Sequence, residues 1–514
     1  MSAFPITHAL NSTDAPARHP NRLGAAMKRR VVGQGVMGPT LRSGARSAAG
    51  IGLLRVRAET VRIVAAASPV ALIGLFNMML GITDIVMVGR FDSGGLGAIV
   101  MIGDLHSIVF NFTAGFAGVV APYVAAAIGA RVPWQVCTIV KRIMLLVSIL
   151  AVAGMVVIWN AVAILDTAGT TLDDPKTAQD YARYMAGAYF FMVLFAFGRH
   201  ALSAVARSRF AVVAIVLALP LKVLANEICM SGAFGWQGMG VAGVGFASLI
   251  VAVLMGGSLT AFLCLSRSFD GFRGMVPVMP PVFAPEALLR LLRPASLMGL
   301  AAIAETGAFL GSTILIGVVA ADALIAHGLA FRAMAACYLL LAGLGQAVII
   351  RIAFLDGRAS CRQERYAHLA IAACAFTLIF LLSSLFVLAN SHIAHLMAWT
   401  IGGAGEELVA EIAALLPLAG LALAAAVPAH LISAFLRAKK RALGAVTILA
   451  VGHSGVGVLS MILLGAAGLG AIGIWIGLLL GAATASTCGL VYLRLKHACA
   501  CRGRDRDRLE RGRS

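Results

Sequence analysis

The chain has 514 residues, of which 60% are hydrophobic and only 12% are charged. The charged fraction is about half that of an average soluble domain, so the composition excludes an ordinary soluble enzyme or binding domain. The net charge is +19. Binding of nucleic acid needs a basic face on a folded soluble domain, and the sequence contains no such domain, which excludes nucleic acid as the partner.

The chain opens with a basic segment, residues 1–60, that holds nine Lys or Arg against two acids, Asp14 and Glu59. No apolar run occurs before about residue 62, so this segment is not a secretory signal peptide. We predict a disordered cytoplasmic tail.

Twelve apolar runs follow, each close to the ~20 residues that cross a bilayer as a helix. The sequence therefore predicts an all-α integral membrane protein with twelve transmembrane helices. The predicted spans are 62–88, 97–122, 136–159, 181–203, 209–231, 240–265, 292–318, 322–350, 367–389, 406–435, 443–465 and 470–493.

The basic residues lie mainly in the even-numbered linkers, such as Arg207 in the fourth and Lys440 in the tenth, whereas the odd-numbered linkers hold acids such as Asp166 and Glu406. Lys and Arg stay on the cytoplasmic side of a membrane. We expect both termini to be cytoplasmic and the protein to lie in the bacterial inner (plasma) membrane.

The two halves resemble each other at an offset of about 225–230 residues. Segment 238–252 matches 468–482, and 68–74 matches 293–299. Each half has an even number of spans, so both insert the same way up, and we predict two six-helix lobes related by a pseudo-twofold axis with a substrate cavity between them. The lobes are 61–265 and 292–495, joined by a cytoplasmic linker, 266–291, and followed by a charged cytoplasmic tail, 496–514.

The pattern G-x-G-x-x-G occurs at Gly238–Gly243 and at Gly468–Gly473. A dinucleotide fingerprint needs a preceding strand, and here each copy opens an apolar span. We interpret the glycines as a tight turn followed by close helix packing. No cofactor is expected, and no metal site, because the cysteines lack histidine partners at ligand spacing.

Charged residues inside a span cost about 2.5–3.5 kcal/mol each, so those present are candidates for function. Asp84 lies towards the outer end of the first span, and Lys222 and Asn226 lie in the outer half of the fifth. Lys222 and Asn226 are four residues apart and so share a helix face. The three could form a cluster that binds and releases a proton; a fixed structural ion pair is the alternative.

In the second half, Glu305 lies in the middle of the seventh span, and His327 and Arg332 lie in the eighth. We expect Glu305 to pair with Arg332, since pairing makes two buried charges tolerable. Glu305 is a candidate substrate-cation or proton site, whereas a lone histidine such as His327 is more often a packing residue. The weaker candidates are Asp104, His106, His430 and His453.

Six segments in register resemble the multidrug and toxic compound extrusion (MATE) family over about residues 60–497. They are "SPVALIGLFNMMLGITDIVMVGR", "APYVAAAIGAR", "NEICMSGAFGWQGMGVAG", "RPASLMGLAAIAETGAF", "IAHGLAFR" and "GAIGIWIGL". The resemblance implies an antiporter that exports organic cations or other amphipathic compounds in exchange for protons or sodium. It also implies that Asp84, Asn226 and Glu305 bind the coupling cation or substrate. One departure is Ala426, where the family often has an acid in the tenth span.

We therefore predict a secondary active antiporter that works by alternating access, is not an enzyme, and acts as a monomer in the lipid bilayer on a small amphipathic or cationic substrate. Lys222 and Arg332 would compete with sodium beside each acid, so a proton is the expected coupling ion. Two alternatives stay open. One is a lipid-linked saccharide flippase of the same broad superfamily, with Lys222 and Arg332 contacting a pyrophosphate. The other is a membrane-embedded enzyme, for which no clustered nucleophile or metal triad is found.

Overall fold

The computed structural model describes residues 48–91, 96–132, 134–167, 174–232, 237–265, 285–399 and 405–511. Residues 53–514 form one compact unit. Residues 1–47 of the predicted tail and residues 266–284 of the predicted linker lie outside the described part. Within it, every regular element is a helix.

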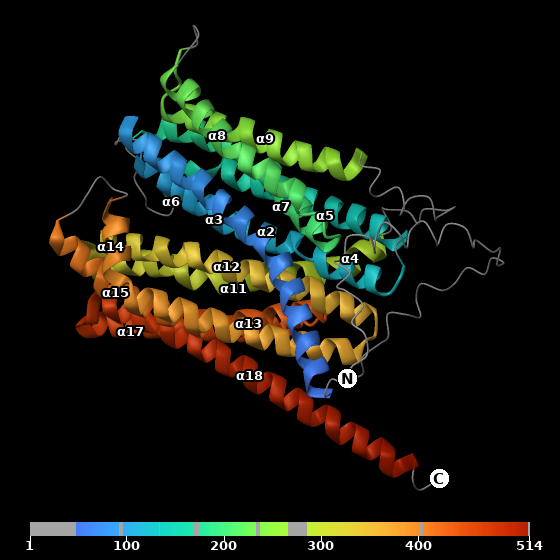
Figure 1. Cartoon of the computed structure of the whole chain (residues 1–514). Helices are drawn as coiled ribbons and strands as arrows, with labels where there is room; N and C mark the ends of the chain where they lie inside the picture. Colours follow the sequence, from blue (N-terminus) through green and yellow to red (C-terminus); the bar gives the residue numbers. More distant parts are fainter. Residues whose placement is uncertain are drawn as a thin grey trace. The chain divides into compact units, whose positions relative to one another are not determined.

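The first lobe is coloured from blue to green in Figure 1 and corresponds to the first six predicted spans. Its first helix begins at Ala48, fourteen residues before the predicted start near residue 62. The lobe consists of α2 (Ala48–Phe91), α3 (Leu96–Ala117), α4 (Val120–Gly129), α5 (Trp134–Trp159), α6 (Ala161–Thr167), α7 (Pro175–Ala204), α8 (Arg209–Ser231) and α9 (Val241–Leu265).

The second lobe is coloured from yellow to red. Its central helices α12 and α15 pack against each other, and α15 also packs against α13 and α18. The lobe consists of α11 (Pro285–Val319), η3 (Ala321–Ala323), α12 (Leu324–Gly357), α13 (Cys361–Leu388), α14 (Asn390–Trp399), α15 (Glu406–Ala438), α16 (Ala442–Leu449), the π-helical η4 (Ala450–Gly457), α17 (Val458–Leu464), η5 (Gly465–Leu469) and α18 (Gly470–Arg511).

Eleven stretches of the described chain are long and apolar enough to cross a membrane, and the last of them, Ala442–Leu495, contains two crossings. Its 54 residues would measure about 81 Å as a straight helix, against a hydrocarbon core of about 30 Å. The backbone turns instead at Gly468 (φ +88°) and Gly470 (φ +52°), and η4 and α17 pack along α18. The twelve-helix, two-lobed fold predicted from the sequence is therefore confirmed.

The two G-x-G-x-x-G segments have the role predicted for them. Each contains a glycine with positive φ, Gly240 (+60°) in the first and Gly468 in the second. The last glycine of each packs on backbone: a Cβ on Gly473 would lie 2.8 Å from the Leu464 carbonyl oxygen, and one on Gly243 would meet the Cys229 carbonyl. The glycines thus provide the turn and the close helix packing.

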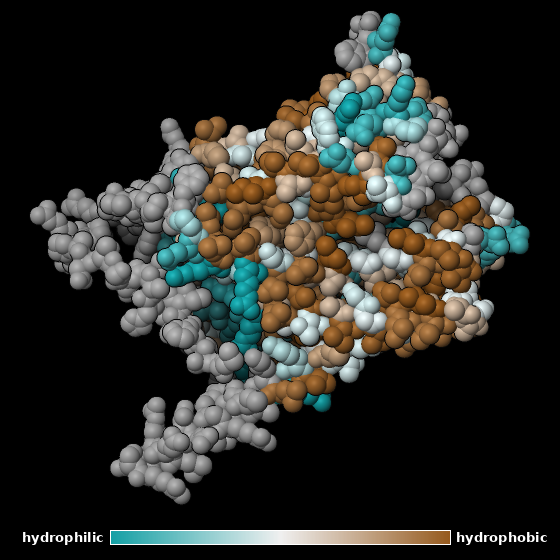
Figure 2. All heavy atoms as spheres, turned by 180° about the vertical axis from the view of Figure 1, so that it is seen from behind, coloured by the Kyte–Doolittle hydropathy of each residue, from teal (hydrophilic) through white to brown (hydrophobic). Residues whose placement is uncertain are grey.

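Apolar side chains cover much of the outer surface, as the brown area in Figure 2 shows. On α13, for example, Phe376, Phe380 and Leu388 are 74%, 63% and 80% exposed. A contiguous apolar surface of this extent suits contact with lipid rather than with water. The surface therefore agrees with a protein that spans a membrane.

The two lobes meet through reciprocal glycine contacts. Gly129 of α4 packs on the backbone of Phe354 in α12, while Gly357 of α12 packs on the backbone of Ala126 in α4. Both the glycines and their partners differ by 228 in residue number. The contact therefore maps onto itself when the two halves of the repeat are exchanged, as a pseudo-twofold axis requires.

A second reciprocal contact uses the same offset. A Cβ on Gly115 of α3 would lie 2.9 Å from the carbonyl oxygen of Met298 in α11, and one on Gly343 of α12 would lie 2.8 Å from that of Ala67 in α2. Gly115 and Gly343 again differ by 228. The glycines of the two reciprocal contacts let the lobes approach until their backbones touch.

Candidate functional site

The strongest candidate site is a buried polar cluster in the first lobe. Nζ of Lys222 lies 2.8 Å from Oδ1 of Asp84, and Nδ2 of Asn226 donates to the same oxygen over 2.8 Å. Lys222 also donates to the hydroxyl of Ser248. Lys222 and Asn226 are 3% and 0% exposed. The structure therefore brings together the three residues that the sequence predicted as a cluster.

The cluster depends on three helices. Asp84 belongs to α2, Lys222 and Asn226 lie one turn apart on α8, and Ser248 comes from α9. The amide of Asn226 donates to Asp84, while its buried Oδ1 receives no hydrogen bond from the described residues. Asn226 thus keeps an acceptor available beside the carboxylate.

A cavity of about 330 Å³ adjoins the cluster, a size within the ~300–1,000 Å³ range of small-molecule sites. Asp84, Lys222 and Ser248 form part of its wall, so both members of the ion pair are accessible from it. The other lining residues are mainly apolar, aromatic or methionine: Asn77, Met78, Leu80, Gly81, Ile85, Gly103, Asp104, His106, Ser107, Phe110, Tyr181, Met185, Met192, Val251, Ala252 and Met255.

Two of the weaker sequence candidates, Asp104 and His106, line this cavity. The imidazole of His106 stacks on Phe110 with the ring centroids 5.8 Å apart, and it meets the edge of Tyr189 at 5.5 Å. Its Nε2 is buried without a described hydrogen-bond partner. His106 is therefore a polar group held among aromatic rings at the cavity wall.

The second lobe holds a different buried pair. Glu305 of α11 hydrogen-bonds with Nδ1 of His430 in α15, and both side chains are less than 10% exposed. Tyr338 of α12 hydrogen-bonds to Glu305, and its ring meets that of His430 edge to face at 5.8 Å. His430 lies one helical turn after Ala426, the position where the sequence lacks an acid.

The expected Glu305–Arg332 pair is not formed among the described residues, in which Glu305 pairs with His430 instead. Arg332 and Tyr338 are six residues apart on α12, which rotates them by about 120° about the helix axis. Because Tyr338 faces Glu305, Arg332 points to another side and is half-buried there.

His327 lies apart from this pair in a fully buried aromatic environment. Its Nε2 is 3.3 Å from the hydroxyl of Thr313, and its ring lies 5.9 Å from that of Phe331 and 5.4 Å from that of Trp475. These neighbours are typical of a packing residue.

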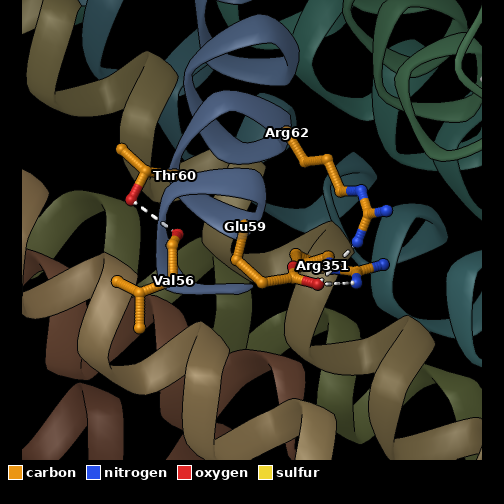
Figure 3. A network of polar contacts seen from close by, with 5 residues as sticks. All are labelled: Val56, Glu59, Thr60, Arg62 and Arg351. Carbon is orange, nitrogen blue, oxygen red and sulfur yellow. Dashed lines mark hydrogen bonds and ion pairs between the residues drawn. The ribbon is translucent and has the colours of Figure 1, made fainter. Parts of the chain in front are cut away.

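Sequence reasoning missed a further, partly buried network, which Figure 3 shows. Nε and Nη2 of Arg351 in α12 donate to Oε2 and Oε1 of Glu59 in α2, each over 2.7 Å. Arg62 donates to Oε1 over 2.7 Å. The bidentate pair links the two lobes. Glu59 is one turn before buried Ile63 on the same helix face, a spacing that could have identified it as a buried acid.

The model of the MatE family matches residues 69–228, which include all three cluster residues. A probable multidrug resistance protein NorM of Mesorhizobium japonicum is 28% identical over 59% of this chain and 64% of its own length. Its namesake in Rhizobium meliloti is 26% identical over 67% of this chain and 74% of its own length. The match thus spans just under two thirds of the first of these relatives.

Solved structures share the fold. A MATE family transporter in an outward-facing conformation gives a TM-score of 0.74 at 18% identity, over 88% of this chain and 99% of that one. A MOP superfamily transporter from Pyrococcus furiosus gives 0.73 at 18% identity, over 88% and 98%. The family model, the relatives and the fold agree, and over these parts the chain is similar to the MATE family of membrane transporters.

Proposed function

We propose that the protein exports small amphipathic or cationic compounds by alternating access, in exchange for protons. The observation that carries this proposal is the buried Asp84–Lys222–Asn226 cluster, which opens onto a cavity of substrate size. The names of the relatives, probable multidrug resistance proteins, support export of drug-like compounds.

The contacts of Asp84 favour a proton over sodium as the coupling ion. The ammonium of Lys222, 2.8 Å from Asp84, already occupies the position that a bound sodium ion would take. A second full charge there would be repelled by Lys222 in a medium of low dielectric constant. A proton instead binds to the carboxylate itself and neutralises it. Lys222 is then released from its ion pair with Asp84 and keeps its hydrogen bond to Ser248.

The cavity wall suits a variable amphipathic substrate. Met78, Met185, Met192 and Met255 are flexible and polarisable, and such residues adapt to ligands of different shape. A substrate that contacts Asp84 from the cavity would compete there with a proton. Binding of one would thus displace the other, which is the elementary step of antiport.

The Glu305–His430 pair is proposed as a second proton-responsive site, in the other lobe. Asn226 is proposed as a ligand that steadies Asp84, and Arg332 and His327 stay predictions. The flippase alternative gains no support, because Lys222 is neutralised by Asp84 and Arg332 is not among the residues lining the described cavity. We further propose a monomer in the inner membrane of a bacterium with both termini in the cytoplasm, which reporter fusions at each end would test.

The proposed function is tested by dye efflux from proteoliposomes with proton and sodium gradients imposed separately. We expect efflux with a proton gradient alone and its loss in Asp84→Asn. The control is Asp180→Asn, which removes an acid from an exposed pair with Arg183 on α7 and should leave efflux unchanged. Efflux driven by sodium alone would contradict proton coupling, and unchanged efflux in Asp84→Asn would remove Asp84 from the mechanism.

A further inference from the structure

A second cavity, of about 420 Å³, lies beside the Glu59–Arg351 pair and is separate from the site described above. Its wall combines the first turns of α2 with the start of α13. The lining residues are Arg55, Ala58, Glu59, Arg62, Ser360, Arg362, Gln363 and Tyr366. It is the size of a small-molecule site but is lined mainly by polar groups.

The cavity is positively charged. Three guanidinium groups face one carboxylate, that of Glu59, and Arg351 already engages both oxygens of this carboxylate. Arg62 also donates a hydrogen bond to the Glu59 carboxylate. Arg55 and Arg362 therefore contribute positive charge that no carboxylate lining the cavity balances.

Arg55 and Arg362 converge on one point. Both hydrogen-bond to the hydroxyl oxygen of Tyr366, and the guanidinium carbon of Arg55 lies 5.6 Å from the centre of that ring. A guanidinium has five N–H donors in a planar fork, so one phenol oxygen uses only part of what the two arginines offer. Two guanidinium groups aimed at one oxygen are well placed to bind the oxygens of a phosphate.

The position of the cavity along α2 puts it at the level of lipid headgroups. The span Gly52–Gly89 has 38 residues and measures about 57 Å as a helix, which exceeds the ~30 Å of a hydrocarbon core. Arg55 and Arg62 lie in its first turns, before the long apolar part. Its two ends must therefore reach the interface, where phosphates are found.

Exposed apolar side chains flank the cavity on both helices. Leu53, Leu54 and Val61 of α2 are 72%, 47% and 61% exposed, and Leu369 of α13 is 52% exposed. A soluble anion would leave this apolar surface uncovered, whereas the acyl chains of a lipid would cover it. The combination of arginines with this apolar border favours a lipid ligand.

We propose that this cavity binds the phosphodiester headgroup of an anionic phospholipid such as phosphatidylglycerol. Arg55 and Arg362 donate to its phosphate oxygens, and its acyl chains lie along the exposed leucines. Arg55 belongs to one lobe and Arg362 to the other, so the bound lipid bridges them. The lipid therefore favours the conformation in which the start of α13 lies against α2, because a ligand stabilises the state that it binds better.

The test is lipid binding to the full chain in detergent, followed by native mass spectrometry. The ligands are phosphatidylglycerol, phosphatidylcholine with the same acyl chains, and glycerol 1-phosphate as a soluble competitor. The variant Arg55→Ala/Arg362→Ala is compared with Arg57→Ala/Arg365→Ala, which removes two exposed arginines of the same helices that do not line the cavity.

We expect the first double variant to bind phosphatidylglycerol about 30-fold more weakly, as follows for two basic residues at an anionic surface, and the control to stay within about threefold. The variant Arg55→Lys/Arg362→Lys keeps the charge and serves as a control for misfolding. It should lose less affinity for phosphatidylglycerol than the alanine variant. Equal loss in both alanine variants would show general surface attraction and overturn the site. Displacement of the lipid by millimolar glycerol 1-phosphate would show that the cavity binds a soluble phosphate, and would contradict the proposal of a lipid ligand.

Discussion

At the scale of single residues, the stability of the Asp84 cluster depends on pairing rather than on either charge alone. Removing one partner of a buried ion pair leaves an uncompensated charge, which costs about 3 kcal/mol or more, whereas removing both is often tolerated. Lys222, at 3% exposure, fits this case. The same reasoning explains why a lysine can lie within an apolar span at all.

We therefore predict that Lys222→Met destabilises the protein by about 3 kcal/mol and that Asp84→Asn/Lys222→Met recovers most of the loss. Thermal unfolding in detergent measures both. A double variant that is less stable than Lys222→Met would show that the ion pair is not the source of the effect.

Lys439 gives a residue-scale prediction outside the spans. Its ammonium lies 2.6 Å from Asp356 and 2.8 Å from Glu364, so it ties the ends of α12, α13 and α15 together. Burial lowers the pKa of Lys439, but the two carboxylates outweigh it and raise the pKa above its ordinary value.

A lysine whose pKa is raised on folding stabilises the folded state fully below the unfolded pKa of about 10.4, and this contribution disappears as the pH rises through the folded value. We expect Lys439→Met to lower the unfolding temperature equally from pH 7 to about pH 10, and the difference from wild type to shrink at higher pH. Lys176→Met, at an exposed position, should show no such pH-dependent difference. A constant difference at all pH values would assign the effect to packing.

At the scale of helices, the decisive contacts are those where glycine allows two backbones to touch. Gly129 packs on the backbone of Phe354, which cannot rotate away as a side chain could. Gly257, also within a helix, faces open space. The two positions share a residue type and differ only in their surroundings.

We predict that Gly129→Ala destabilises the protein by about 1–3 kcal/mol through overpacking, whereas Gly257→Ala is neutral or stabilises by up to about 1 kcal/mol through helix propensity. Thermal unfolding of both variants provides the comparison. Similar behaviour of the two would mean that the lobes adjust easily at α4 and α12.

At the scale of the whole molecule, the Glu59–Arg351 pair is a bidentate contact between the lobes at the end where we expect the cytoplasm. Breaking it leaves a half-buried arginine without its carboxylate. The alternating access that we propose requires this end to open, so the pair should bias the equilibrium towards the closed state.

We predict that Glu59→Gln increases the reactivity of cysteines introduced along the α4–α12 contact towards a water-soluble maleimide, while Arg62→Gln has little effect. Arg62 contacts the same carboxylate but belongs to the same helix and is 61% exposed. Unchanged reactivity in Glu59→Gln would exclude the pair as a latch.

The sequence alone determined the span count, the two lobes and the first-lobe cluster. Apolar length, charge alternation and the spacing of Lys222 and Asn226 are local properties of the chain. In a bilayer the backbone of such a segment must satisfy its own hydrogen bonds, which a helix does. For the same reason the glycine turns at residues 238–243 and 468–473 were predictable.

Only the tertiary structure decided which residues meet across helices. The rotation of α12 directs Tyr338 rather than Arg332 to Glu305, so that His430 became the partner of that acid. The length of α2 brought Glu59 into contact with Arg351, 292 residues away. A helical pattern states which residues share a face, but helix rotation and depth follow from packing against neighbours, and these set every long-range pair.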